Sequence, residues 1–159
     1  MKSIHLNEII DELEMLMEEY KTYFNKKTYK ITSISTTHLR KAEDVEEGEL
    51  DTFPDWIKHE LVEAIAILED EEDGQYVELP SKFQVNEYEI MKEFSFSQDA
   101  PIQSHLLRTI DGRGAFRRFK DEIISLNIEQ EWYSYRRQQL RKIAVNWCER
   151  NSIKYMDDK

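Results

Sequence analysis

The residues best suited to chemistry lie in the stretch "GRGAFRRFKDEI", residues 112–123. A helical pattern follows the two glycines, and at about 100° per residue Arg113, Arg117 and Lys120 fall on one stripe of that helix. A phosphate or carboxylate binds well where helix N–H groups, a partial dipole charge and cations meet, and glycine lets the backbone approach a ligand closely. The stretch therefore predicts an anion site at the start of this helix.

The same stretch also fits an ordinary helix start with a charged face, and we favour that interpretation. It is shorter than a P-loop and no GK[ST] follows it, so it does not predict a nucleoside triphosphate site. Arg117 and Asp121 are four residues apart, as are Arg118 and Glu122, so each pair can interact on a solvated face.

Arg136 is the second candidate, because the helical pattern places it between Trp132 and Trp147, in the middle of an apolar stripe. A buried guanidinium without a partner costs several kcal/mol, so we expect an acid from the N-terminal part, an aliphatic stem with its head in water, or an anionic ligand. A structural ion pair is the favoured outcome. Together the predicted anion-binding residues are Arg113, Arg117, Lys120 and Arg136.

The remaining reactive residues do not form a catalytic set. The segment "HELVE" has Glu63 where a zinc protease needs its second histidine, and the acidic runs lack the spacing of a calcium loop. The single cysteine, Cys148, lies at the edge of an apolar stripe and is expected to be a buried, inert thiol. We therefore predict no metal and no cofactor, and we favour a protein that is not an enzyme.

The N-terminal half predicts a helix, a hairpin and a second helix. A helix over residues 6–20 is predicted by an apolar stripe at steps of three and four: Leu6, Ile10, Leu13, Met17 and Tyr20. β-Branched residues between polar ones predict a hairpin over 21–35 with its turn at 25–28. An acidic loop follows at 43–51. Thr52, Pro54 and Asp55 then predict the start of a helix. Its expected buried stripe is Trp56, Leu61, Ala64, Ile65 and Leu68.

The C-terminal half predicts a short strand and then helices. "QYVELP" at residues 75–80 is the strand, and Ser81 is the expected cap of a helix over 82–94. A short helix over 102–110 ends at Asp111 and Gly112. The last two patterns, residues 114–126 and 129–153, are separated by so few residues that we expect an antiparallel helix pair. Phe116, Phe119, Ile123 and Leu126 are the expected apolar side of the first.

Composition limits the class of protein. A chain of 159 residues with 40% hydrophobic residues is long enough for a single α+β domain over residues 1–159, and a net charge of −11 disfavours nucleic acid as a partner. Residues 1–104 hold 10 Lys/Arg and 25 Asp/Glu, whereas residues 105–155 hold 11 and 6. The basic C-terminal helices are therefore expected to dock on the acidic remainder, although a basic face kept for an anion is the alternative.

The order of several motifs resembles a known family. "YVELP", "YEIMKEF", "GRGAFRRFKDEI" and "EWYSYRRQQLRKIAVNWCERNSI" occur in the order seen in the bacterial group called uncharacterised protein family 0158. The resemblance covers roughly residues 53–155. It implies no activity and carries over no catalytic residues.

The sequence thus predicts an α+β fold with an N-terminal helix, a small antiparallel sheet of a hairpin plus at least one more strand, and a helical C-terminal half. We expect a soluble interaction or regulatory module with a protein partner, and a binder of a small anion or phosphate as the alternative. No apolar run approaches the roughly 20 residues that span a bilayer, so we expect a cytoplasmic protein with no membrane contact. The sequence leaves the oligomeric state open.

Overall fold

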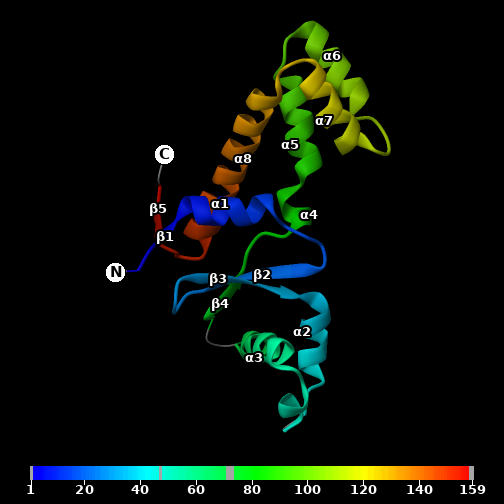
Figure 1. The fold of residues 1–159 in the computed structure, drawn as a ribbon. Coiled ribbons are helices and arrows are strands. Elements are labelled where there is room, and N and C mark those ends of the chain that lie inside the picture. The colour runs from blue at the N-terminus through cyan, green and yellow to red at the C-terminus, as the bar shows by residue number, and fades with distance from the viewer. Residues whose placement is uncertain (1, 47, 71–73, 158–159) are drawn as a thin grey trace.

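The computed structural model describes residues 2–46, 48–70 and 74–157. A three-stranded sheet lies in the middle of an elongated molecule, with α2 and α3 on one side and α1, α8 and the other C-terminal helices on the opposite side (Figure 1). The elements in chain order are β1 (Ile4–His5), α1 (Leu6–Glu14), β2 (Tyr20–Asn25), β3 (Lys30–Ser35), α2 (Thr36–Glu43), the 3-10 helix η1 (Glu49–Thr52), α3 (Asp55–Glu69), β4 (Tyr76–Glu78), α4 (Lys82–Val85), α5 (Glu87–Phe96), α6 (Ala100–Thr109), α7 (Ala115–Ser125), α8 (Glu129–Arg150) and β5 (Tyr155–Met156).

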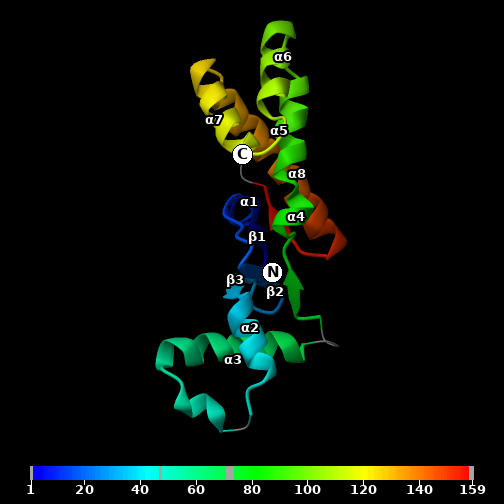
Figure 2. The same cartoon turned by 90° about the vertical axis from the view of Figure 1, so that its right-hand side faces the viewer.

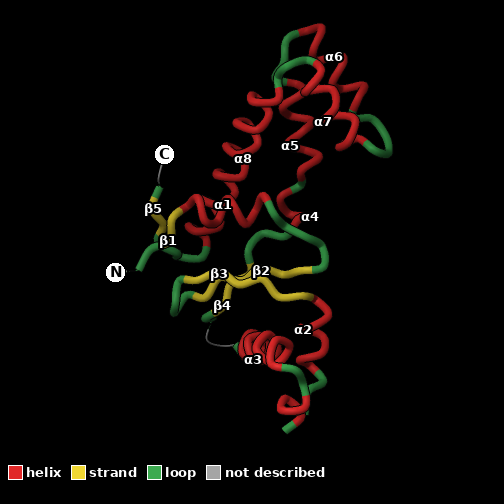
Figure 3. The backbone as a smooth tube through the Cα atoms, viewed as in Figure 1, coloured by secondary structure: helices red, strands yellow, loops and turns green. Residues whose placement is uncertain are grey.

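The sheet has the order β3-β2-β4 and is antiparallel throughout, which confirms the predicted hairpin and third strand. The hairpin turn is held by Asn25, whose Oδ1 accepts from the N–H groups of Lys27 at 2.9 Å and Thr28 at 3.2 Å. Tyr29 closes the turn with a φ of +59°. A separate parallel pair, β1 with β5, brings the two ends of the chain together. Figure 3 shows both pairings in yellow.

The two faces of the sheet bury different cores because strand side chains alternate. Phe24 and Ile31 pack on the side of α1 and α8, whereas Tyr23 and Ile34 pack on the side of α2 and α3. Figure 2 shows the sheet edge-on between these two helical layers. The fold is therefore α+β, as expected, with helices on both faces of a small sheet.

The N-terminal helix is shorter than predicted. It ends at Glu14, and Tyr20 begins β2 instead of completing the helix. Met17, on the expected apolar stripe, is 52% exposed. Apolar residues at helical spacing continue past the helix end, but from Tyr20 onward the chain pairs with β3 and forms a strand.

A helix that the sequence did not predict follows the hairpin. Ser35 caps α2 by accepting from the Thr37 N–H at 3.1 Å. The β-branched pair Thr36 and Thr37 hides this start, because such residues favour strands. Leu39 and Ala42 then reach the core beneath the sheet.

The next helix starts later and buries less than predicted. Thr52 caps nothing on α3, because its hydroxyl donates to the Glu49 carbonyl at 2.6 Å within the 3-10 turn and α3 begins at Asp55. Trp56, expected in the buried stripe, is 70% exposed. Leu61 and Ala64 are buried as predicted.

The predicted helix over 82–94 is divided in two at Asn86. Ser81 and Gln84 form the capping box of α4, which confirms Ser81 as a cap. Asn86 then takes a left-handed φ of +52°, and its side chain caps the new helix by accepting from the Glu89 N–H at 3.3 Å. The division places Glu87 in the first turn of α5, next to a helix N-terminus.

The last helices share an aromatic core. Phe94, Phe119 and Trp132 come from α5, α7 and α8, and their ring centroids lie 4.8–6.1 Å apart in edge-to-face contacts. α7 and α8 are joined by the short turn at residues 126–128 and pack on each other. Phe116 departs from the expected apolar side and is 54% exposed. Within the described residues, no helix combines the length and the apolar character that crossing a bilayer requires.

Candidate functional site

The three basic residues at the start of α7 all face solvent. Arg113, Arg117 and Lys120 are exposed, and within the residues that the structure describes their side chains make no hydrogen bond or ion pair. Asp121 is therefore not paired with Arg117. These cations are available to an anion from solution, but they lie on an open helix surface.

The glycine turn before α7 is occupied by the chain itself. Arg118 reaches back and donates to the carbonyls of Thr109 at 3.0 Å, Asp111 at 2.6 Å and Arg113. A Cβ added to Gly114, which has a φ of +75°, would lie 3.0 Å from Arg118 Nη1. The absence of a side chain at Gly114 thus leaves room for the Arg118 guanidinium, which donates hydrogen bonds to carbonyls of the loop. Arg118 does not form the expected pair with Glu122.

Arg136 is paired inside the protein. Its Nε donates to both oxygens of Glu87 at 3.0 and 3.1 Å, and Nη2 also lies within 3.5 Å of the Glu14 carbonyl. Both side chains of the pair are 20% exposed. Burial alone would lower the pKa of Arg136, but hydrogen bonds and charge from Glu87 outweigh burial and raise the pKa. Of the outcomes expected for Arg136, the structure shows the ion pair, and its partner Glu87 belongs to the acidic part of the chain, residues 1–104.

The neighbouring arginine makes the same kind of contact. Arg137 Nη1 lies 2.9 Å from Glu14 Oε1, and Nη2 lies 3.1 Å from Asp11 Oδ1. α8 therefore docks its basic side on the acidic α1 and on the start of α5. The basic residues Arg136 and Arg137 of α8 are thus neutralised by acids within the protein, whereas, among the described residues, Arg117 and Lys120 of α7 are not.

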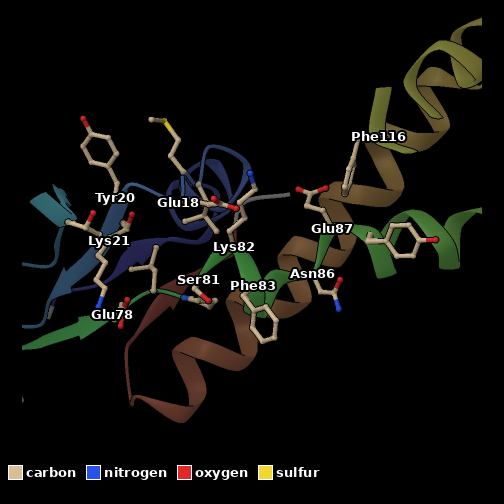
Figure 4. Close-up of a pocket in the computed structure, with 17 residues that line it drawn as sticks. Glu18, Tyr20, Lys21, Glu78, Ser81, Lys82, Phe83, Asn86, Glu87 and Phe116 are labelled. Carbon is tan, nitrogen blue, oxygen red and sulfur yellow. The ribbon is translucent and has the colours of Figure 1, made fainter. Parts of the chain in front are cut away.

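A groove lies where the sheet meets the helical half of the molecule, and the ion pair lies beside it. Its larger part has a volume of about 560 Å³, and its smaller part, of about 270 Å³, reaches Arg136. The two parts share Leu16, Lys82, Glu87 and Phe116. Figure 4 shows Tyr20, Lys21 and Glu78 on the sheet side and Glu87 and Phe116 on the helical side, with α4 between them. We call this hollow the junction groove.

Large apolar side chains on the junction groove are exposed to solvent. Phe83 is 91% exposed, Phe116 54%, Met17 52% and Tyr20 43%. α4 has only four residues, so it can bury Val85 but must leave Phe83 outside. Arg113, Arg117 and Lys120 do not line the groove, so Arg136 is the one predicted site residue that the described structure brings to it.

Sequence patterns did not predict this groove. Phe116 and Met17 were expected on buried stripes, and Phe83 carried no signal of its own. A usable signal was Asn86, since asparagine tolerates the left-handed backbone that ends α4 after one turn. A helix that short exposes whichever aromatic residue is not directed at the core.

The reactive groups elsewhere are embedded in structure. Burial, followed by repulsion from Glu149, raises the pKa of the Cys148 thiol to about 11, so this fully buried cysteine is no thiolate at neutral pH. His38 Nδ1 lies 2.9 Å from Glu60 Oε2 beneath the sheet. Among the described residues, no three or more His, Cys, Asp or Glu side chains gather closely enough to hold a metal ion.

Comparison with known proteins gives a family and no further relative. The model of the Uncharacterised protein family (UPF0158) matches residues 3–159. No curated protein and no solved structure matches the chain. The match extends the resemblance from residues 53–155 to the N-terminal helix and hairpin.

Proposed function

Since the chain belongs to uncharacterised protein family UPF0158, whose description assigns no activity, we propose from the geometry that the protein is a non-enzymatic interaction module that binds a segment of a partner protein in the junction groove. The observation that carries the proposal is the exposure of Phe83, Phe116, Met17 and Tyr20 around one hollow. Exposed aromatic residues grouped at a concavity are typical of protein interfaces.

The size and chemistry of the groove favour a protein segment over a small molecule. A compound inside a space of about 560 Å³ leaves the rim ring of Phe83 in water, whereas a helix or loop laid across the groove covers it. Lys21 and Lys82 stand beside Glu18 and Glu78 on the lining, so the rim offers charges of both signs to a partner. The Arg136–Glu87 pair lines the smaller part of the groove.

Paired variants test the groove. Phe83→Ser removes the most exposed ring, and Phe96→Ser is the matched control because Phe96 is 54% exposed and does not line the groove. Immobilised wild-type protein and both variants are incubated with cell lysate at low and moderate salt, and retained proteins are quantified by mass spectrometry. We expect a partner that wild type and Phe96→Ser retain and Phe83→Ser loses. If no retained protein depends on Phe83, the groove is not the interaction site.

The unpaired cations of α7 support a second candidate function, the binding of a small anion or phosphate. Arg113, Arg117 and Lys120 have no partner in the described structure and could serve such a ligand together with Arg136, if Arg136 left Glu87. A thermal-shift screen of nucleotides, phosphorylated metabolites and inorganic phosphate tests it. A ligand at a hundred times its dissociation constant stabilises by about 2.7 kcal/mol, and Arg117→Gln should abolish that shift. If no compound in the screen shifts the melting temperature, anion binding is excluded and the interaction module is the one remaining candidate function.

The cellular setting is part of the same proposal. We place the protein in the bacterial cytoplasm, because a single cysteine fits a reducing compartment and the sequence carries no membrane-spanning run. Fractionation of cells that produce a tagged chain, followed by immunoblotting of each fraction, checks this placement.

A further inference from the structure

The outer edge of β3 carries backbone groups without a partner. Just beyond the paired strands, the Thr36 N–H donates to the Glu19 carbonyl on the β2 side at 2.8 Å. On the other side of β2, the Leu79 N–H donates to the carbonyl of Thr22, the residue opposite Ser33, also at 2.8 Å. These bonds fix which residues point inward, so the backbone of residues 31, 33 and 35 points away from β2. The Ser35 N–H is taken by Glu60 Oε1 at 3.2 Å. Across the described residues, the N–H and C=O groups of Ile31 and Ser33 bond to nothing.

The opposite edge of the sheet is partly covered. On β4, the Tyr76 N–H donates to Asp70 Oδ2 at 2.7 Å, and the Glu78 carbonyl accepts from Trp147 Nε1 at 2.9 Å. Proteins protect open edges with charge, proline or a bulge. β3 begins with Lys30, but residues 31–35 read "ITSIS" and carry neither charge nor proline, so the edge at Ile31 and Ser33 is unprotected.

An acidic helix borders this edge. A hollow of about 400 Å³ beside Ile31 is lined by Glu8, Asp11 and Glu12 of α1 and by Lys30. Asp11 is paired with Arg137, but within the described part of the chain Glu8 and Glu12 have no ion partner. Burial, followed by repulsion from Asp11, raises the pKa of Glu12. A cation brought to this hollow would relieve that repulsion.

We propose that β3 binds an extended basic segment of a partner protein as an added antiparallel strand, with its lysine or arginine side chains directed at Glu8 and Glu12. Residues directly opposite each other on neighbouring strands share a face. Ile31 packs on the α1 side of the sheet, so the residues that bond to Ile31 and Ser33 direct their side chains toward α1. In the partner segment, the lysine or arginine residues therefore occupy these positions, which recur at every second residue.

This surface is separate from the junction groove. Ile31, Ser33, Glu8 and Glu12 do not line the groove, so loss of Phe83-dependent binding would leave the β3 proposal untouched. The occupant is set by charge complementarity with α1 and by the backbone pairing that only an extended chain supplies.

A labelled peptide of alternating lysine and threonine is the probe, and fluorescence anisotropy measures its binding at low and at physiological salt. We expect binding that weakens as salt rises. Two control peptides separate the contributions. One replaces every lysine by glutamate, and the other carries an N-methyl group on the backbone amide of each lysine, which keeps the charge and removes the donor. Neither should bind.

Matched variants test the protein side. Ser33→Pro removes the outward N–H without breaking the bonds to β2, whereas Ser33→Val keeps it, and both lose the 2.9 Å contact with Thr22 Oγ1. We expect Ser33→Pro to weaken binding at least about tenfold and Ser33→Val less than about twofold. Glu12→Gln should weaken binding about threefold at low salt, whereas Glu89→Gln, at an exposed residue of α5, changes the same charge without effect.

Three results would overturn the proposal. Equal binding of the N-methylated peptide excludes strand addition. Equal binding of the glutamate peptide excludes recognition of basic side chains by Glu8 and Glu12. A dimer in sedimentation that Ser33→Pro converts to monomer assigns the edge to a second copy of the chain. Circular dichroism checks that Ser33→Pro is folded. If it is not, the N-methylated peptide on wild-type protein decides.

Discussion

Arg136 of α8 and Glu87 of α5 form an ion pair across 49 residues of sequence, with Arg136 Nε within 3.0 and 3.1 Å of the two carboxylate oxygens. The carboxylate lies in the first turn of α5, so it faces both a guanidinium and a helix N-terminus. The pair joins two helices and forms part of the lining of the junction groove. The most anomalous charge of the last helix is thereby used for structure.

Breaking this pair should destabilise the fold. Glu87→Gln leaves a guanidinium that is 20% exposed facing an amide, and we expect the free energy of unfolding to fall by about 2 kcal/mol. Urea unfolding followed by tryptophan fluorescence measures the change. The double variant Glu87→Gln/Arg136→Met should lose less than the sum of the single changes, because the two residues interact directly. Additive losses would show that the pair contributes no coupling.

The hydrogen bond from Trp147 to the Glu78 carbonyl should have a measurable energy. Trp147→Phe keeps an aromatic ring in a site that is 3% exposed but leaves the carbonyl at the β4 edge without its donor. We expect a loss of about 1 kcal/mol beyond the loss of ring area. Trp132→Phe is the control, since no hydrogen bond of the Trp132 indole occurs in the described structure. Equal losses, from urea unfolding midpoints, would argue against the bond.

Stability should depend on pH through Glu60. Burial raises the pKa of this carboxyl, but the close contact of His38 and the hydrogen bond from the Ser35 N–H outweigh burial and set the pKa below its ordinary value of 4.5. A lowered pKa means that the contribution is fully present above 4.5 and is lost as the pH falls through the folded-state pKa. Glu60→Gln should therefore flatten the acid limb of a stability–pH profile from urea unfolding, and Glu89→Gln should leave it unchanged.

Cys148 should resist thiol reagents while the protein is folded. Its side chain is fully buried and its pKa is raised to about 11, so both access and thiolate are lacking at pH 8. Labelling with a disulfide reagent should proceed only as fast as the chain opens, and at once in concentrated urea. Rapid labelling of the folded protein, measured by absorbance, would contradict the buried inert thiol.

Much of the fold could be predicted from local pattern. The hairpin, the third strand, the Ser81 cap and the two long C-terminal helices follow from side-chain period and cap chemistry, which act within a few residues. The predictions that were wrong share a cause. Tyr20, Trp56 and Phe116 lie at apolar positions of plausible stripes, but a stripe is buried only where a partner element covers it, and that depends on distant chain.

The candidate sites divide in the same way. Arg136 was recognisable because a charge on an apolar stripe requires a partner, yet many acids of the N-terminal part could have supplied it. The choice of Glu87 rests on the break at Asn86, which directs the first turn of α5 toward α8. The open edge of β3 could not be predicted from the sequence, because an edge is defined by the absence of a neighbouring strand.

The sequence by itself determined the type of most elements, many of the apolar residues of the core and the charge asymmetry between the two parts of the chain. These follow from interactions within a few residues and from composition. Tertiary structure alone decided which charges pair, which aromatic residues remain in water and which strand edge stays open. Each of these depends on the packing of elements far apart in sequence, as when Arg136 meets Glu87 while Arg113, Arg117 and Lys120 remain exposed on α7 and the turn before it.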